Sequence, residues 1–209
     1  AALRPEARQY CYICKQDYTA IHHFYDQLCP LCAAFNFSKR TETADLSGRV
    51  ALLTGGRVKI GYQAGLKLLR AGAILIVTTR FPRDSAQRYA REPDFGEWGQ
   101  RLEIFGLDLR HTPSVEALCG QLLATLPRLD FIINNACQTV RRPPAFYTHM
   151  MEHEQTALSH MPETIRNLVG SYDGLRSDPL LTSDPAVRVQ EGLTRAAELS
   201  QIPLLAEDL

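Results

Sequence analysis

Lysine is absent from the sequence after Lys67, so most of the chain has no lysine at all. An excess of charge of either sign is also missing, because Lys plus Arg and Asp plus Glu each number 23. This balance removes the bulk attraction that draws basic proteins to nucleic acid or to anionic membranes. No apolar run reaches the roughly 18 residues of a transmembrane helix, and no signal-peptide layout opens the chain. Nucleic acid is therefore not expected as a main partner, and no membrane segment is expected.

The 209 residues suffice for one ordinary domain and an appendage, with room for a substantial core. Apolar residues make up 45% of them, which is typical of a folded, soluble protein. We therefore expect a cytoplasmic protein. Because the sequence opens at Ala1 without Met, the earlier removal of an organelle-targeting segment stays open.

Cysteines are concentrated at the start of the chain, where four of the six lie within the first 32 residues. They form two C-x-x-C pairs, Cys11 with Cys14 and Cys29 with Cys32. Two such pairs around a short loop let four thiolates converge on one tetrahedral ion. Zinc suits sulfur ligands, and four of them leave no position for a reacting water. The sequence predicts a structural zinc site that stabilises a small module, residues 1–44 with its linker.

Two alternatives for these cysteines are disulfides, which a reducing cytosol disfavours, and free thiols, which leave the paired spacing unexplained. His22 and His23 lie between the pairs and are not needed, because four cysteines complete the site. RNA binding through this module, with Lys39 and Arg40 just beyond it, is expected to be modest in a neutral chain. Elsewhere, Cys119 falls in a helical pattern, which predicts a small core residue.

From Asp45 onward, short apolar segments alternate with amphipathic ones. Runs of strand length are RVALLT, ILIVTTR, RLEIFGLDL and LDFIINNA, and helical spacing marks YQAGLKLLRAGA and SVEALCGQLLATL. Strands that alternate with helices of about 10–15 residues predict βαβ units, a parallel sheet and right-handed crossovers. The predicted fold class is α/β, a Rossmann-like doubly wound sheet that is incomplete, with strands 1–4 within residues 45–140.

Three motifs lie at the ends of these predicted strands. TGGRVKIG, from Thr54 to Gly61, follows the first strand and opens a helix; Asp108-Leu109 follows the third; and NNAC, from Asn134 to Cys137, ends the fourth. In this order they resemble the T-G-x-x-x-G-x-G turn, the adenine-contacting acid and the N-N-A-G motif of short-chain dehydrogenases/reductases. The resemblance covers the front half of that family, over residues 45 to about 137. It implies a dinucleotide whose pyrophosphate lies at the N-terminus of the first helix.

The end of the second predicted strand distinguishes NAD from NADP, because an acid there holds a ribose hydroxyl whereas an arginine accommodates a 2′-phosphate. This chain has Arg80 at that point, and Arg57 and Lys59 add positive charge nearby, so NADP is favoured over NAD. The alternative for Arg80 is a solvated surface residue. The residues that the resemblance assigns to the cofactor are Thr54, Gly55, Arg57, Lys59, Ile60, Gly61, Arg80, Asp108, Leu109, Asn135 and Ala136.

Two residues depart from the family pattern. Lys59 stands where the turn has its middle glycine, which lets the backbone approach phosphate. A left-handed backbone at Lys59 costs about 1–2 kcal/mol, which an ammonium–phosphate contact would offset. Its side chain would instead block the site if it packed across the phosphate position. Cys137 replaces the last glycine of N-N-A-G, close to the expected nicotinamide.

Catalysis in the resembled family depends on a tyrosine acid with a lysine four residues later, whose charge lowers the tyrosine pKa. None of the eight tyrosines has a lysine at that spacing. Tyr172 is followed at that distance by Arg176, but arginine is always charged and is no simple substitute for lysine. The catalytic residues therefore remain unknown, and this chain alone is expected to be inactive.

Residues 141–209 predict helices and loops, without a fifth strand. The fourth strand, LDFII, would then be an apolar sheet edge, which proteins normally cover. We expect self-association or a protein partner there. Three explanations stay open: a longer enzyme with the missing half beyond Leu209, which we favour; missing internal segments; or a genuine short pseudoenzyme.

Two functions are therefore compared. The first is an NADP-dependent oxidoreductase, represented by its zinc module and its cofactor-binding part and acting on a small-molecule substrate. The second is a non-catalytic, zinc-containing Rossmann scaffold or interaction protein. A Tyr-x-x-x-Lys pair in a longer form of the chain would favour the first.

Overall fold

The structure is a computed structural model that describes residues 8–137, 142–177 and 196–202. The chain divides into two compact units, Ala1–Ala44 and Asp45–Leu209. None of the helices within the described ranges has both the length and the apolar character that crossing a membrane requires.

The N-terminal unit consists of two short strands and a helix. β1 (Gln9–Tyr10) pairs antiparallel with β2 (Asp17–Tyr18), and α1 (Pro30–Ser38) continues into the 3₁₀ helix η1 (Lys39–Thr41). Pro30 suits the first turn of α1, where its missing N–H has no helical partner in any case. The buried apolar side chains of this unit are Cys11, Tyr18, Leu28, Cys29 and Ala33. So small a core needs a further source of stability.

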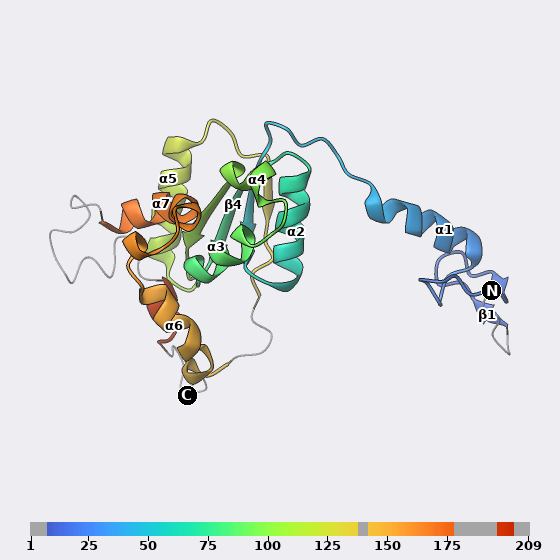
Figure 1. The fold of residues 1–209 in the computed structure, drawn as a ribbon. Helices are drawn as coiled ribbons and strands as arrows, with labels where there is room; N and C mark the ends of the chain where they lie inside the picture. Colours follow the sequence, from blue (N-terminus) through green and yellow to red (C-terminus); the bar gives the residue numbers. More distant parts are fainter. Residues whose placement is uncertain (1–7, 138–141, 178–195, 203–209) are drawn as a thin grey trace. The chain divides into compact units, whose positions relative to one another are not determined.

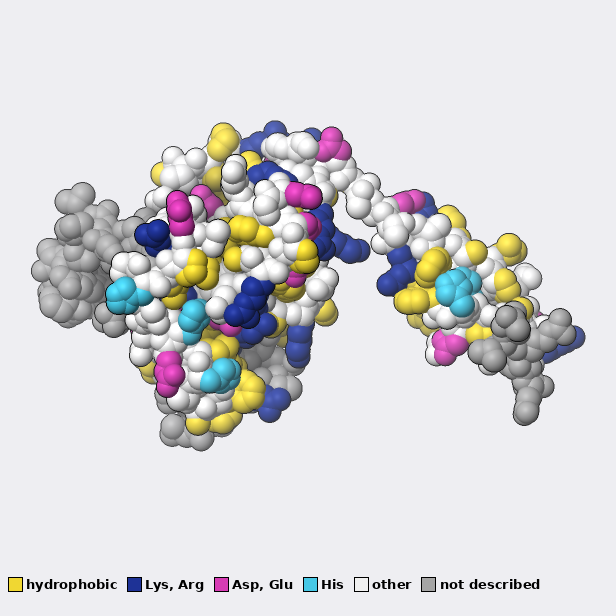
Figure 2. Space-filling view, viewed as in Figure 1, with side chains coloured by type: hydrophobic (Ala, Val, Ile, Leu, Met, Phe, Trp, Pro, Cys, Tyr) yellow, Lys and Arg dark blue, Asp and Glu magenta, His cyan; other side chains and the backbone are white. Residues whose placement is uncertain are grey.

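Large apolar side chains lie on the surface of this unit, where Figure 2 shows hydrophobic groups beside histidine and basic side chains. Phe24 carries the Arg40 guanidinium over its ring at 4.2 Å, and Phe37 contacts the rings of His22 and His23. His22 Nδ1 accepts hydrogen bonds from nearby backbone amides. Both histidines therefore belong to an aromatic surface group.

The second unit contains a parallel sheet, as the alternation of strand and helix segments predicts. Its strands are β3 (Val50–Thr54), β4 (Ile74–Thr79), β5 (Leu102–Gly106) and β6 (Phe131–Ile133), arranged β5-β4-β3-β6. All three pairings are parallel. The carboxyl ends of the strands, where the predicted motifs lie, therefore meet at one edge of the sheet.

Helices cover both faces of the sheet. The first four helices of the unit are α2 (Lys59–Arg70), α3 (Pro82–Ala90), α4 (Phe95–Trp98) and α5 (Thr112–Thr125), and η2 (Gly99–Arg101) follows α4. Figure 1 shows α2 and α5 on opposite sides of the sheet. Side chains alternate along each strand, so Leu53 and Val77 face α2 while Val50 and Ile76 face α5. The doubly wound architecture is confirmed.

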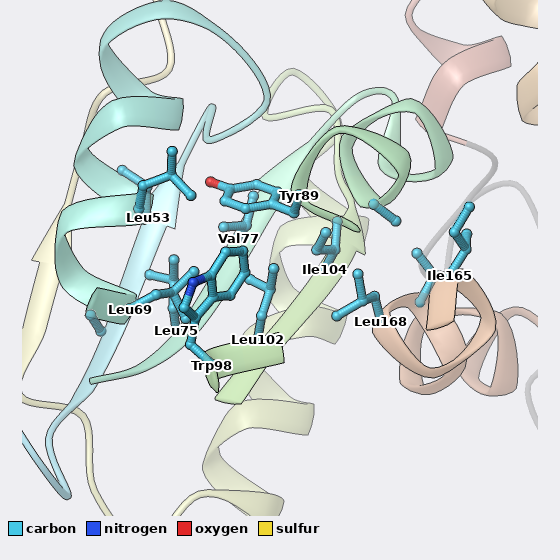
Figure 3. Close-up of a cluster of buried hydrophobic side chains, with 14 of the residues drawn as sticks. Leu53, Leu69, Leu75, Val77, Tyr89, Trp98, Leu102, Ile104, Ile165 and Leu168 are labelled. Carbon is cyan, nitrogen blue, oxygen red and sulfur yellow. The ribbon is translucent and has the colours of Figure 1, made fainter. Parts of the chain in front are cut away.

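The larger core lies on the α2 face. Trp98 and Tyr89 are fully buried there, and their rings meet edge to face at 6.1 Å between centroids. Figure 3 shows them with Leu53, Leu69, Leu75 and Leu102, and with Ile165 and Leu168 approaching from α7. The tail of the chain therefore contributes to this core.

The described residues after 141 contain helices and no strand, as the sequence predicts. These elements are η3 (Pro144–Tyr147), α6 (Thr148–Gln155), η4 (Leu158–His160), α7 (Glu163–Ser177) and α8 (Ala196–Leu199). α7 packs on β5, and its Tyr172 is buried against Gly106. β6, at the other end of the sheet, has β3 as its one strand partner among the described residues, and 60% of Ile132 is exposed.

The prediction for Cys119 is wrong, because this residue is exposed on α5. Leu118 and Leu122 of the same helix are buried against the sheet, as predicted. Leu123, one turn beyond Cys119, is 85% exposed. The Cys119 side of α5 therefore lies turned away from the described core, and apolar character alone did not reveal which side packs.

Candidate functional site

The turn between β3 and α2 is held in shape by two glycines. Gly55 has a φ of +69°, and a Cβ there would lie 2.9 Å from the Ala136 Cα. A Cβ on Gly61 would lie 2.3 Å from the Gly55 carbonyl oxygen and 2.4 Å from the Asn135 amide nitrogen. Larger residues at either position would push the turn away from the end of β6.

Thr54 and Asn135 connect this turn to the end of β6. The Thr54 hydroxyl accepts hydrogen bonds from the backbone amides of Asn135 and Ala136, both at 3.0 Å. The Asn135 side-chain amide donates to the carbonyl oxygens of Thr54 and Gly55, at 3.2 and 3.1 Å. The structure thus brings together two of the sequence motifs, which lie some 80 residues apart.

Lys59 adopts the left-handed backbone that a glycine would favour, with a φ of +53°. Its side chain is exposed, and so is its neighbour Ile60. The two border an open depression of about 570 Å³ along α2, which Gln63, Ala64 and Lys67 also line. The backbone at Lys59 therefore carries the steric cost of a left-handed conformation. The Lys59 side chain is not buried within the turn.

The N-terminus of α2 is suited to bind an anion. Val58, the residue before the helix, is extended and provides no side-chain hydrogen bond to the first turn, which holds no acidic residue. The first amide N–H groups of a helix have no helical acceptor, and the helix dipole places positive charge there. A pyrophosphate can satisfy both.

Arg57 and Arg80, the two arginines expected near the 2′-phosphate, contact other residues of the protein. Arg57 forms an ion pair with Asp84 at 2.7 Å, and its guanidinium also lies 3.4 Å from the Met150 sulfur. Arg80 lies over the Tyr147 ring at 5.4 Å and within 3.4 Å of the Tyr147 hydroxyl. Both arginines thus contact the segment formed by η3 and α6, residues 144–156.

Asp108 is buried and paired with a neighbouring arginine. The Arg110 guanidinium donates to both Asp108 carboxylate oxygens, at 2.7–3.0 Å, and also to the carbonyl oxygen of Leu199 at the end of α8. Leu109, next to it, is exposed. The sequence placed Asp108 at the correct strand end but gave no sign of these partners.

Glu154 of α6 is a buried carboxylate that sequence reasoning did not identify. It accepts hydrogen bonds from the backbone amides of Arg83 and Asp84, at 3.1 and 2.8 Å, in the first turn of α3. Burial raises the pKa of Glu154 to about 7, although these two amides favour the ionised form. A carboxylate from the tail therefore occupies the N-terminus of α3.

A comparison with known protein families shows to which family this sheet and its turn belong. The family described as short chain dehydrogenase matches residues 49–164, which is more than half of the chain. The chain belongs to the short-chain dehydrogenase family. The predicted family, and the incomplete α/β fold that goes with it, are confirmed.

Two similar proteins cover part of the chain. An uncharacterised protein of Acanthamoeba polyphaga mimivirus is 39% identical over 171 residues, which are 79% of this chain and 36% of that protein. The fatty acyl-CoA reductase of Acinetobacter baylyi is 30% identical over 98 residues, 47% of this chain and 32% of the reductase. This chain thus spans about a third of their length.

Among solved structures, a short chain dehydrogenase from Mycobacterium smegmatis superimposes with a TM-score of 0.41 and 25% identity. The match covers 61% of this chain and 52% of that one.

The tyrosines of the second unit are buried or partly buried. Tyr62 and Tyr89 contact each other beside α2, and burial, with a hydrogen bond from Tyr62 to Glu92, raises the pKa of Tyr62. Tyr147 is buried against Phe81. Tyr172, which with Arg176 comes nearest to the spacing of the catalytic pair, is only 2% exposed and lies in the core.

The four N-terminal cysteines converge, as their spacing predicts. The Sγ atoms of Cys11, Cys14, Cys29 and Cys32 all lie within 4.8 Å of one another. The Cys14 and Cys29 sulfurs are 3.7 Å apart, close to the roughly 3.8 Å that two sulfurs on one tetrahedral zinc would have. No histidine or carboxylate joins this group among the described residues. The donor set fits a closed, four-sulfur metal site.

Electrostatics within the cluster favour a cation. Burial would raise the pKa of Cys11, but amide hydrogen bonds, chiefly from Cys29 and Cys14, lower it to about 6. The hydrogen bond with Cys29, followed by burial, raises the pKa of Cys32 to about 12. Four thiolates cannot gather this closely without a positive ion to offset their repulsion. Lys15, next to the first pair, has a φ of +61°, which turns the chain back after Cys14.

Proposed function

We propose that the second unit binds NADP and that this chain is the cofactor-binding part of an oxidoreductase of the short-chain dehydrogenase/reductase type. The observation that carries the proposal is the β3–α2 turn, where Gly55 and Gly61 pack against Asn135 and Ala136 and leave the start of α2 exposed. This arrangement fits a pyrophosphate on backbone amides. Bound NADP would supply hydride-transfer chemistry.

The other predicted site residues have distinct roles in this proposal. Ile60 is 79% exposed beside the turn, where an apolar side chain can pack on the cofactor. Lys59 would contribute its ammonium group to the phosphates. Arg80 directly follows β4 and supports NADP over NAD, because its guanidinium would pair with a 2′-phosphate. Asp108 and Leu109 would border the adenine.

The substrate is proposed to be a small molecule, in keeping with the family. Hydride transfer by the family's route needs a tyrosine acid with a nearby lysine, and no Tyr-x-x-x-Lys pair exists in this sequence. We propose that the chain by itself binds cofactor without turning over substrate.

Titration with NADPH, followed by its fluorescence, tests the binding proposal. Saturable binding below about millimolar concentration, the usual upper range for enzyme ligands, supports it. Arg80→Ala should weaken NADPH binding about tenfold and leave NADH binding nearly unchanged, because only NADPH carries the 2′-phosphate. Absence of NADPH binding to wild type and to variants alike would remove the proposed function.

A non-catalytic scaffold is the second candidate, and the buried Tyr172 and the exposed edge of β6 favour it. An edge strand with apolar side chains such as Ile132 invites self-association or a protein partner. Light scattering that gave a dimer of the full chain, together with no NADPH binding, would select this candidate.

For the N-terminal unit we propose a structural zinc ion held by Cys11, Cys14, Cys29 and Cys32. The four-sulfur set without an open position supports a structural and not a catalytic metal. We propose a cytoplasmic location, where cysteines stay reduced and available to zinc.

A further inference from the structure

We propose that residues 144–156, here named the cover segment, are an autoinhibitory element that must leave the adenosine end of the nucleotide site before NADP can bind fully. The inference rests on the proposed function. It concerns the regulation of that site by the chain's own tail.

The first observation is that the cover segment contacts Arg80, which is assigned to the 2′-phosphate, and Arg57, which adds positive charge nearby. The Arg80 guanidinium lies beside the stacked rings of Phe81 and Tyr147, at 5.6 and 5.4 Å from their centroids. Arg57 is directed at Asp84 and the Met150 sulfur. A phosphate that paired with either guanidinium would have to compete with these contacts.

The second observation is the carboxylate of Glu154 at the start of α3. Arg80 follows β4 and lies two residues before α3 begins, so a 2′-phosphate on Arg80 would lie near the buried carboxylate of Glu154. Two negative groups in a buried place repel each other strongly. Glu154 of the cover segment thus puts a negative charge near the position that the 2′-phosphate of the dinucleotide would take.

The third observation is the set of contacts by which the cover segment docks. Tyr147 stacks on Phe81 at 5.3 Å with an interplanar angle of 29°, and Met150 and Ala197 complete this apolar group. The Arg83 guanidinium donates to the carbonyl oxygens of Glu154 and Thr156, at the end of α6. These contacts join one short segment to α3, so the cover segment can detach as a local unit while the sheet stays folded.

The two ends of the nucleotide site therefore differ. The start of α2 lies exposed and without a side-chain cap, whereas the start of α3 is capped by Glu154. When the binding-competent state is a minor one, the apparent affinity falls by its population. A cover segment closed ten to one lowers NADPH affinity about tenfold.

Two substitutions with matched controls test the proposal on the full chain. Tyr147→Ala removes the stacked ring, and its control is Phe146→Ala, an exposed neighbouring aromatic residue. Glu154→Gln removes the carboxylate charge, and its control is Glu152→Gln, an exposed residue of the same helix. Each test variant should lower the NADPH dissociation constant about tenfold, and the controls should lie within about twofold of wild type.

Ligand fragments locate the effect. Adenosine 2′,5′-bisphosphate should gain affinity in the two test variants by the same factor as NADPH, because it occupies the covered end. Nicotinamide mononucleotide should not gain. Equal NADPH affinity in wild type, test variants and controls would overturn the inference while leaving the proposed function in place.

Hydrogen exchange on wild type provides a measurement that does not depend on how the variants fold. Saturating NADPH should speed exchange of the Arg83 and Asp84 amides, because their acceptor Glu154 leaves. Binding of NADPH with unchanged protection of these amides would show that the cover segment stays closed, and would also overturn the inference.

Discussion

Arg83 and Glu154 cap each other's helices. The Glu154 carboxylate accepts from amides in the first turn of α3, while the Arg83 guanidinium donates to carbonyl oxygens at the end of α6. Both side chains are buried, at 6% and 7% exposure. Each group matches the dipole of the opposite helix, so the pair fixes the tail to the sheet domain.

The buried carboxylate predicts a pH dependence of stability. The folded pKa of Glu154, about 7, lies above its ordinary value of 4.5, so the folded state holds more protons between those two values. Stability should therefore fall as pH rises from about 4.5 to about 7, by up to roughly 3 kcal/mol, and level off above. The charged groups facing Glu154 are Arg83 and Asp84 of α3.

Urea unfolding at several pH values measures this effect as the difference between wild type and Glu154→Gln. The variant should lose the slope in this window, whereas Glu152→Gln should keep it. A wild-type slope that persists in Glu154→Gln would assign it to other groups.

Lys59→Gly should stabilise the second unit by about 0.5–1 kcal/mol. Glycine relieves the left-handed backbone at this residue, and part of that gain is offset by the greater freedom of glycine in the unfolded chain. Lys67→Gly, in the interior of the same helix, should instead destabilise by about 1 kcal/mol. Chemical denaturation of both variants checks the predicted opposite signs.

Gly61→Ala should destabilise the second unit by roughly 2–3 kcal/mol and abolish NADPH binding. The added Cβ would lie 2.3 Å from the Gly55 carbonyl oxygen, so the turn must move. Gly120→Ala is the control, because nothing lies within 4 Å of its Cβ, and it should stabilise α5 by up to about 1 kcal/mol. Thermal melts and NADPH titration measure both. Retained binding in Gly61→Ala would show that the turn is not the phosphate site.

Cys29→Ser should release the metal and unfold residues 8–41, because structural zinc supplies much of the folding free energy of so small a unit. Metal analysis should give one zinc per wild-type chain and none in the variant. Cys119→Ser, which changes an exposed cysteine outside the cluster, should keep the zinc. Full secondary structure of the N-terminal unit after chelation would contradict the prediction.

The elements closest to the site were predictable because they follow local rules. A buried strand, a glycine turn and a helix come in sequence order at Thr54–Gly61, and parallel strands place Asn135 beside that turn without any long-range knowledge. The cysteine cluster was predictable from spacing alone.

The cover segment was not predictable from the sequence. Glu154 lies some 70 residues from the amides that it caps, and nothing in its neighbourhood distinguishes it from the solvated acid Glu152. The prediction for Cys119 was wrong for a related reason, because tertiary contacts decide which side of α5 packs. Partners brought together by the fold leave no local pattern.

Trp98 is the only tryptophan of the chain, and it lies in the core beside Tyr89 and Phe95. Its emission therefore reports on the sheet domain and is silent about the cysteine module. A fluorescence transition and a metal-release transition can consequently be followed in one sample as separate signals, each reporting on one of the two units.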